Sequence, residues 1–188
     1  MLSLIVPVAI GYLAVRSVSS GLSGAAERGR LDVLLSAPVS RYLLVASGFA
    51  ATAVELASVL VISLLLTMLG SWLAGAGLAF GPALAGFANV WPLALLFAAL
   101  GIVVTGFSLR TSVVTGSVAG VLVTMYVVDL IGRLDTGLSG VRYASVFKYY
   151  GNAIEDGIDP LAFAGITAVA VALAAIGAWL FDRRDLAA

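Results

Sequence analysis

The stretch RYLLVASGFAATAVELASVLVISLLLTMLG, residues 41–70, decides the fold of this chain. After Arg41 it contains one charged residue, Glu55, and is otherwise apolar, small or hydroxyl-bearing. A helix needs about 20 mainly apolar residues to cross the hydrocarbon core of a bilayer. The stretch therefore predicts a membrane-spanning helix. It is longer than one crossing, so we expect it to tilt or to leave its last turn near Trp72 at the interface.

The rest of the chain repeats this pattern. Of its 188 residues, 62% are hydrophobic and 11% are charged, and the mean hydropathy is +1.13, which excludes a water-soluble domain. Further apolar stretches of spanning length lie near residues 1–20, 85–108, 112–132 and 160–181. The expected fold class is all-α: a polytopic transmembrane bundle of five spans that forms a single domain over residues 1–188.

Local signals mark the ends of the spans. Ser40 is a candidate N-cap of the second span, Asp159 and Pro160 read as N-cap and first residue of the fifth, and Gly132 is a candidate stop for the fourth. Trp91 and Pro92 indicate either the outer end of the third span or a kink in it.

Two connections are long enough to have structure of their own. The Gly- and Ala-rich residues 71–90 predict an outer turn or a re-entrant piece. Residues 133–159 mix charged and aromatic side chains, a composition suited to short interfacial helices.

The orientation follows from the distribution of arginine, because positive side chains stay cytoplasmic during insertion. Placing the loop 21–41 inside leaves three cationic residues outside: Arg133, Arg142 and Lys148. It leaves a larger group inside: Arg16, Arg28, Arg30, Arg41, Arg110, Arg183 and Arg184. We therefore expect the N-terminus outside and the C-terminus in the cytoplasm.

Several classes of function are poorly provided for. The chain has neither Cys nor His, so we expect no catalytic residues and no metal site. Its net charge is zero and it has no basic run, so nucleic acid is not an expected partner. It lacks the G-x-x-x-x-G-K-[ST] phosphate loop, and its one lysine, Lys148, is expected on the outer side.

A charged island separates the first two spans. Residues 27–41 read ERGRLDVLLSAPVSR. Leu31, Leu34 and Leu35 share one face of a short helix, and Pro38 ends that helix. The island is therefore either a solvated loop that obeys the arginine bias or a docking segment for a soluble partner.

Two further segments give the island a context. The last span closes with FDRRDL, residues 181–186, and SVFKYY, residues 145–150, precedes it on the expected outer side. The island, the outer segment and the tail, in this order, resemble the permeases of ATP-binding-cassette (ABC) type-2 exporters. Such permeases usually have six spans, so the resemblance implies that the family's first span is not among these residues.

The resemblance implies a function and partners. The chain would be the permease subunit of an ATP-driven exporter in the cell membrane, moving a hydrophobic or amphipathic substrate such as a drug, an antibiotic or a lipid outward. A second permease half and separate ABC ATPase subunits, which hold ATP and Mg²⁺, would complete the transporter. The ATPase would contact the cytoplasmic coupling helix through Glu27, Arg28, Gly29, Arg30, Leu31, Leu34, Leu35, Pro38 and Arg41.

Polar residues inside the spans add two expectations. An ionised Glu55 in mid-span costs roughly 2.5–3.5 kcal/mol on insertion scales. It either faces the substrate pathway or is a protonated carboxyl hydrogen-bonded to a neighbouring span. Asp129 is expected to pair with Arg133 at i+4. Small residues predict tight helix packing: Gly101, Gly106, Gly116, Gly120, Ala170, Ala174 and Ala178.

Other classes of function stay open at this point. An ion-coupled secondary carrier would use Glu55 as its ion site, but it would typically show an internal repeat, and none is evident. A membrane accessory or immunity subunit that transports nothing is the other alternative.

Overall fold

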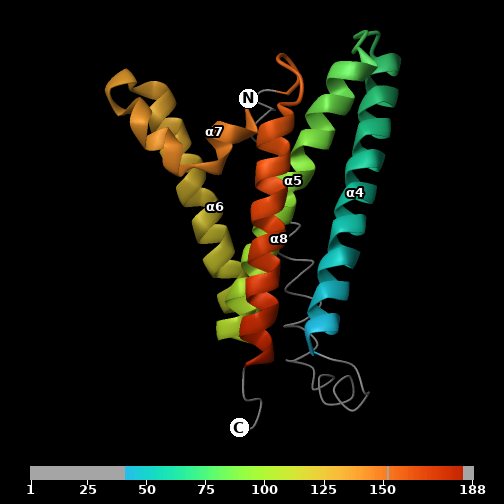
Figure 1. Ribbon diagram of the computed structural model, residues 1–188. Helices are drawn as coiled ribbons and strands as arrows, with labels where there is room; N and C mark the ends of the chain where they lie inside the picture. The colour runs from blue at the N-terminus through green and yellow to red at the C-terminus, as the bar shows by residue number, and fades with distance from the viewer. Residues whose placement is uncertain (1–40, 152, 184–188) are drawn as a thin grey trace.

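The computed structural model describes residues 41–151 and 153–183, and within them the chain is a bundle of helices without strands (Figure 1). The long helices are α4 (Arg41–Leu73), α5 (Phe80–Phe107), α6 (Thr111–Leu134) and α8 (Pro160–Asp182). All four are long and apolar enough to cross a membrane. The predicted first span, the island residues Glu27 to Pro38 and the tail beyond Arg183 lie outside the described residues.

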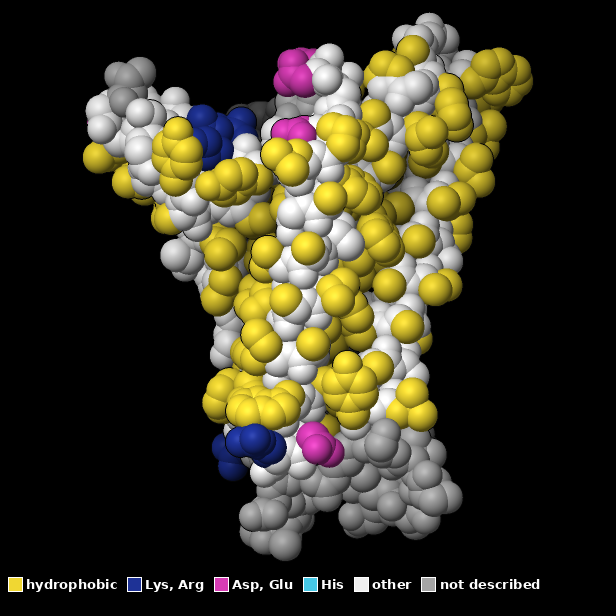
Figure 2. Space-filling view, viewed as in Figure 1, with side chains coloured by type: hydrophobic (Ala, Val, Ile, Leu, Met, Phe, Trp, Pro, Cys, Tyr) yellow, Lys and Arg dark blue, Asp and Glu magenta, His cyan; other side chains and the backbone are white. Residues whose placement is uncertain are grey.

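The four long helices alternate in direction. The beginning of α4, the connection between α5 and α6 and the end of α8 share one end of the bundle, here called the Arg183 end (Figure 1). The opposite, or Asp159, end holds the other connections. Charged side chains gather at these two ends and hydrophobic side chains cover the face between them (Figure 2), as expected of a membrane protein.

Helix α5 is the centre of the bundle. Its sequence is apolar on every side, which is typical of a helix surrounded by others, and it packs against α4, α6 and α8. The crossing with α8 is the closest, since a Cβ atom on Gly177 would lie 2.8 Å from Val103 N, and one on Gly106 would lie 2.8 Å from Leu180 Cβ. Ala170, Ala174 and Ala178 are buried on α8, as predicted for tight packing. Gly116 and Gly120 face open space on α6 instead.

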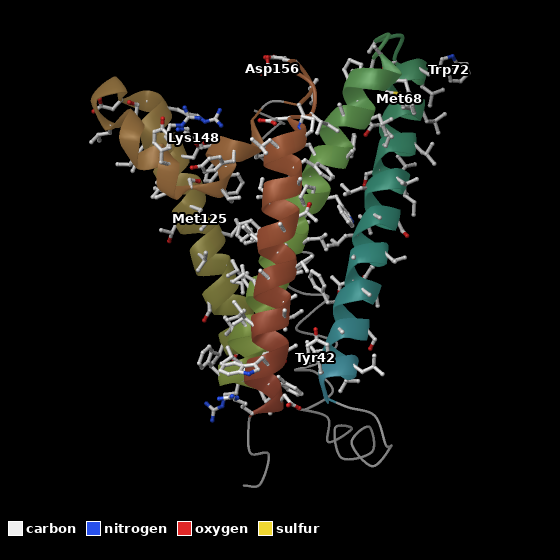
Figure 3. The ribbon with its side chains drawn as sticks, viewed as in Figure 1. Tyr42, Met68, Trp72, Met125, Lys148 and Asp156 are labelled. Atoms are coloured by element: carbon white, nitrogen blue, oxygen red, sulfur yellow. The ribbon has the colours of Figure 1, made fainter. Side chains whose placement is uncertain are left out.

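The connection between α4 and α5 is shorter than predicted. Only residues 74–79 are non-helical, so a turn is present as predicted, but its predicted extent over 71–90 is wrong. Gly75 and Gly77 adopt φ values of 65° and 63°, which non-glycine residues rarely adopt, and this allows the tight turn. Trp72 is exposed at the end of α4 (Figure 3), as expected for an interfacial residue.

Trp91 and Pro92 lie inside α5 and do not mark its end. The indole Nε1 of Trp91 donates to the carbonyl oxygen of Ala53 on α4 at 3.0 Å, and its ring stacks on Phe163 of α8. A hydrogen bond between spans satisfies a polar group that lipid could not satisfy. Trp91 thus ties together three helices.

Candidate functional site

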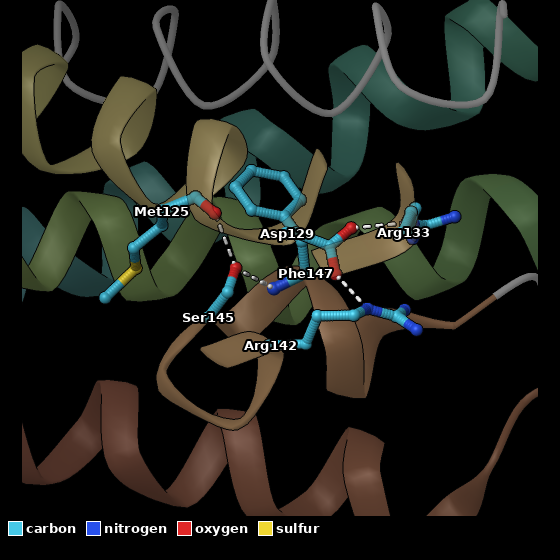
Figure 4. A network of polar contacts seen from close by, with 6 residues as sticks. All are labelled: Met125, Asp129, Arg133, Arg142, Ser145 and Phe147. Carbon is cyan, nitrogen blue, oxygen red and sulfur yellow. Dashed lines mark hydrogen bonds and ion pairs between the residues drawn. The ribbon is translucent and has the colours of Figure 1, made fainter. Parts of the chain in front are cut away.

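The Asp159 end holds a charged cluster around Asp129, near the end of α6 (Figure 4). The Asp129 side chain is 2% exposed, and each of its oxygens accepts from one arginine. Arg133 Nε lies 2.6 Å from Oδ2, and Arg142 Nε lies 2.9 Å from Oδ1. The predicted pair with Arg133 is confirmed, whereas no spacing in the sequence indicates Arg142 as a second partner.

Arg142 belongs to η2, a 3₁₀ helix at Thr136–Ala144 that folds back along α6. Gly132 makes this possible: a Cβ atom there would collide with Arg142 Cγ and would lie 3.2 Å from the Leu138 carbonyl oxygen. The prediction that Gly132 ends α6 is wrong, because the helix continues to Leu134. The glycine instead gives η2 room to approach.

After η2 the chain enters the bundle through Ser145. Its hydroxyl donates to the carbonyl oxygen of Met125 at 2.7 Å and accepts from the backbone N–H of Phe147 at 3.2 Å. Met125 lies nine residues before the end of α6, or about 14 Å along the helix. The short helix α7 (Val146–Tyr150) therefore lies well below the tip of α6.

Helix α7 is fixed by aromatic and polar contacts. Phe147 is fully buried and packs edge-on to Tyr126 of α6, with ring centroids 6.0 Å apart, and beside Phe97 of α5. Asn89 Nδ2 of α5 donates to the Tyr150 carbonyl oxygen at 2.7 Å. Burial raises the pKa of the Tyr150 phenol to about 12. The short helices predicted over residues 133–159 are thus confirmed, and they are anchored to α5 and α6.

A cavity of about 630 Å³ lies between α6 and α8, where Figure 1 shows the two helices diverging, with α7 across it. Its lining is mainly apolar, with Asp159 as the charged residue among the residues that line it. The lining residues are Leu96, Leu100, Met125, Tyr143, Ala144, Ser145, Val146, Tyr149, Asp159, Leu161, Ala162, Gly165, Ile166, Val169 and Leu173. Its size and lining match those of sites for drug-sized molecules.

The two carboxylate oxygens of Asp159 have different surroundings. Its Oδ1 accepts from the backbone N–H groups of Leu161 and Ala162 at 2.9 and 3.3 Å, so the predicted N-cap of α8 is confirmed. Within the described part of the chain no hydrogen bond or ion pair uses Oδ2. This oxygen can therefore accept from a ligand at the edge of the cavity.

The residues predicted to contact an ATPase fall mostly outside the described residues: Glu27, Arg28, Gly29, Arg30, Leu31, Leu34, Leu35 and Pro38. Arg41 is the first residue of α4, at the Arg183 end. Glu55 is exposed on α4 and does not line the cavity. The structure therefore does not bring Glu55 and Asp159 into one site.

Residues 1–182 match a protein-family model described as "Multidrug efflux system permease Rv1217c, C-terminal domain". The chain belongs to this family. A comparison with curated proteins gives no match, and a comparison with solved structures gives none. The multidrug efflux permease family is one of membrane transport proteins, so the expectation of a permease is confirmed at that level. The match covers the Asp129 cluster and the lining of the cavity.

Proposed function

We propose that this chain is the membrane-spanning subunit of an ATP-driven ABC exporter of type 2. The observation that carries the proposal is the match of residues 1–182 to a multidrug efflux permease family. Hydrophobic or amphipathic compounds are the proposed cargo, in keeping with the large apolar cavity. The sequence has no phosphate loop, so ATP and Mg²⁺ would be held by a separate ATPase subunit.

The proposed contact with that ATPase is the island, residues 27–41. The chain leaves the island at Arg41, which lies at the same end of the bundle as Arg110 and Arg183. If this end is cytoplasmic, as the arginine bias predicts, the island is on the side where ATP is available. Closure of the ATPase pair would then move the first span and α4 as rigid bodies, in a complex with a second permease half.

Charge reversal in the island tests this contact. Glu27→Arg and Arg30→Glu, made in the chain co-expressed with its ATPase subunit, should reduce both co-purification and substrate-stimulated ATP hydrolysis. Arg110→Glu is the matched control, because it changes a charge at the same end of the bundle outside the island. Unchanged assembly and unchanged stimulation in the island variants would show that the contact lies elsewhere.

The energy source needs its own test. Efflux of a hydrophobic dye from vesicles should stop when the ATPase subunit carries an inactivated phosphate loop, and it should survive dissipation of the ion gradients. Efflux that needs the gradients and not the ATPase would indicate an ion-coupled carrier. No efflux under either condition would favour an accessory subunit.

A further inference from the structure

The cavity between α6 and α8 has apolar walls and one charged residue. Its walls are formed by aliphatic side chains such as Leu96, Leu100 and Leu173, and its charged residue is Asp159 at the start of α8. The volume of about 630 Å³ accommodates a molecule of drug size. A ligand that fits both parts has an apolar body and a polar or charged group at one end.

The sign of the charge follows from the charged residue that lines the cavity. Between residues 129 and 159 the chain has five carboxylates and three cationic side chains. Arg133 and Arg142 are paired with Asp129, and the Lys148 ammonium lies over the ring of Tyr143. Tyr143 lines the cavity, but none of the three cationic residues does. Figure 2 shows acidic side chains at the end of the bundle above α8 and cationic side chains beside them, toward α6 and α7. Asp159 is the one charged residue among the described residues that line the cavity, so its unpaired oxygen favours a cationic group there.

We infer that this cavity binds amphipathic organic cations. The apolar body lies between α6 and α8, and the cationic group lies at Asp159 Oδ2, while Oδ1 continues to cap α8. This inference rests on the proposed function for its biological meaning, since it names the substrate class of the exporter. It assigns the charge recognition to Asp159, in a different part of the bundle from Glu55.

Two small residues of α8 keep the cavity open. Ala162 and Gly165 line it, and a Cβ atom on Gly165 would have no neighbour within 4 Å. A leucine at either position would extend into the space that the apolar body needs. These positions allow the cavity to be filled without touching Asp159.

Binding of two amphiphiles with the same apolar body and oppositely charged ends tests the inference. Saturable binding of (4-pyrenylbutyl)trimethylammonium and of 4-pyrenylbutane-1-sulfonate is measured by equilibrium dialysis on the full chain in detergent micelles. Asp159→Asn should weaken binding of the ammonium amphiphile by about fivefold, the scale of a partly exposed ion pair, without weakening binding of the sulfonate. Asparagine caps helices as well as aspartate does, so α8 should keep its start.

Control variants separate charge from shape. Asp156→Asn removes a carboxylate from the same connection that does not line the cavity, and it should leave both affinities unchanged. Gly165→Leu should abolish saturable binding of both ions. Ala162→Leu fills the same space and replaces Gly165→Leu if that protein fails to accumulate. Circular dichroism and gel filtration check that each variant is folded.

Three outcomes would overturn the inference: equal losses for both ions in Asp159→Asn, no loss in that variant, or saturable binding that survives both filling variants. Efflux assays on the assembled exporter distinguish failure of this inference from failure of the proposed function. ATP-dependent efflux without binding at this cavity would contradict the inference and leave the proposed function standing. Charge-selective binding at the cavity without any ATP-dependent efflux would contradict the proposed function and leave the inference standing.

Discussion

Arg142 and Asp129 are thirteen residues apart in the chain, yet Arg142 Nε lies 2.9 Å from Asp129 Oδ1. This ion pair joins η2 to α6 and complements the bond from Ser145 to Met125. Together they hold the segment that leads into α7 against the membrane-spanning helix.

The Asp129 cluster should contribute to stability through its buried carboxylate. Breaking a buried ion pair costs about 3–5 kcal/mol, but both arginines are partly exposed, so we expect Asp129→Ala to lose about 2 kcal/mol. Thermal unfolding in detergent measures the loss. Arg142→Ala should also expose η2 to proteases. Arg133→Ala is the matched control, because it leaves the bond between η2 and α6 in place. Equal protease sensitivity in the two arginine variants would contradict this assignment.

The crossing of α5 and α8 should not tolerate a methyl group at Gly177. The new Cβ atom would lie 2.8 Å from Val103 N and 2.9 Å from Ile102 C, and backbone atoms cannot rotate away. Overpacking costs about 1–3 kcal/mol, against a gain in helix propensity of about 1 kcal/mol. We expect Gly177→Ala to lower the unfolding temperature of the isolated chain. Gly116→Ala is the matched control, since it faces open space on α6 and should be neutral or stabilising. Equal effects would show that the two helices separate easily.

Glu55 lies within α4 on its exposed side, in a segment predicted to cross the membrane. If it faces the substrate pathway, Glu55→Gln should raise the apparent KM for efflux of tetraphenylphosphonium by about fivefold. Initial rates in inside-out vesicles containing the assembled exporter provide the measurement. Ser58→Ala, one turn further along α4, should leave KM unchanged. An unaltered KM in Glu55→Gln would favour the other expectation, a protonated carboxyl that packs against a neighbouring span.

The phenol of Tyr150 should ionise at a higher pH than that of an exposed tyrosine. Its pKa is raised from 10.0 to about 12, because burial penalises the tyrosinate. Its contribution to stability is therefore complete below pH 10 and is lost as the pH rises toward 12, where the unfolded chain is already ionised. Ultraviolet difference titration should show a late tyrosinate component that Tyr150→Phe removes. The neighbouring Tyr149→Phe should leave that component in place, and its loss there instead would show that Tyr150 is not the buried phenol.

The spans could be predicted from the sequence because the physics that sets them is local. Length and hydropathy predict α4, α6 and α8 to within about three residues and α5 to within about five, and the dipeptide Asp159-Pro160 indicates the start of α8. The pair of Asp129 with Arg133 followed from helical spacing.

Features that depend on the arrangement of several helices could not be predicted in the same way. Arg142 reaches Asp129 only because η2 folds back along α6, and no sequence spacing encodes that return. The prediction for Gly132 is wrong for the same reason, since the approach of Arg142 to this glycine depends on the three-dimensional arrangement. The cavity arises where α6 and α8 diverge, and its lining residues come from five elements: α5, α6, η2, α7 and α8.

The glycine crossing of α5 and α8 also has a mechanical consequence. At Gly177 the backbones of α5 and α8 are in contact, so the two helices have little room to slide past each other there. The motion that this contact still allows is a rotation of one helix about the crossing point. Gly177 is seventeen residues from Pro160, or about 25 Å along α8. Each degree of rocking would then swing the far tip of α8 by about 0.4 Å. The short part of α8 after Gly177 leads to the Arg183 end and would move little, whereas the long part before it borders the cavity and would move most.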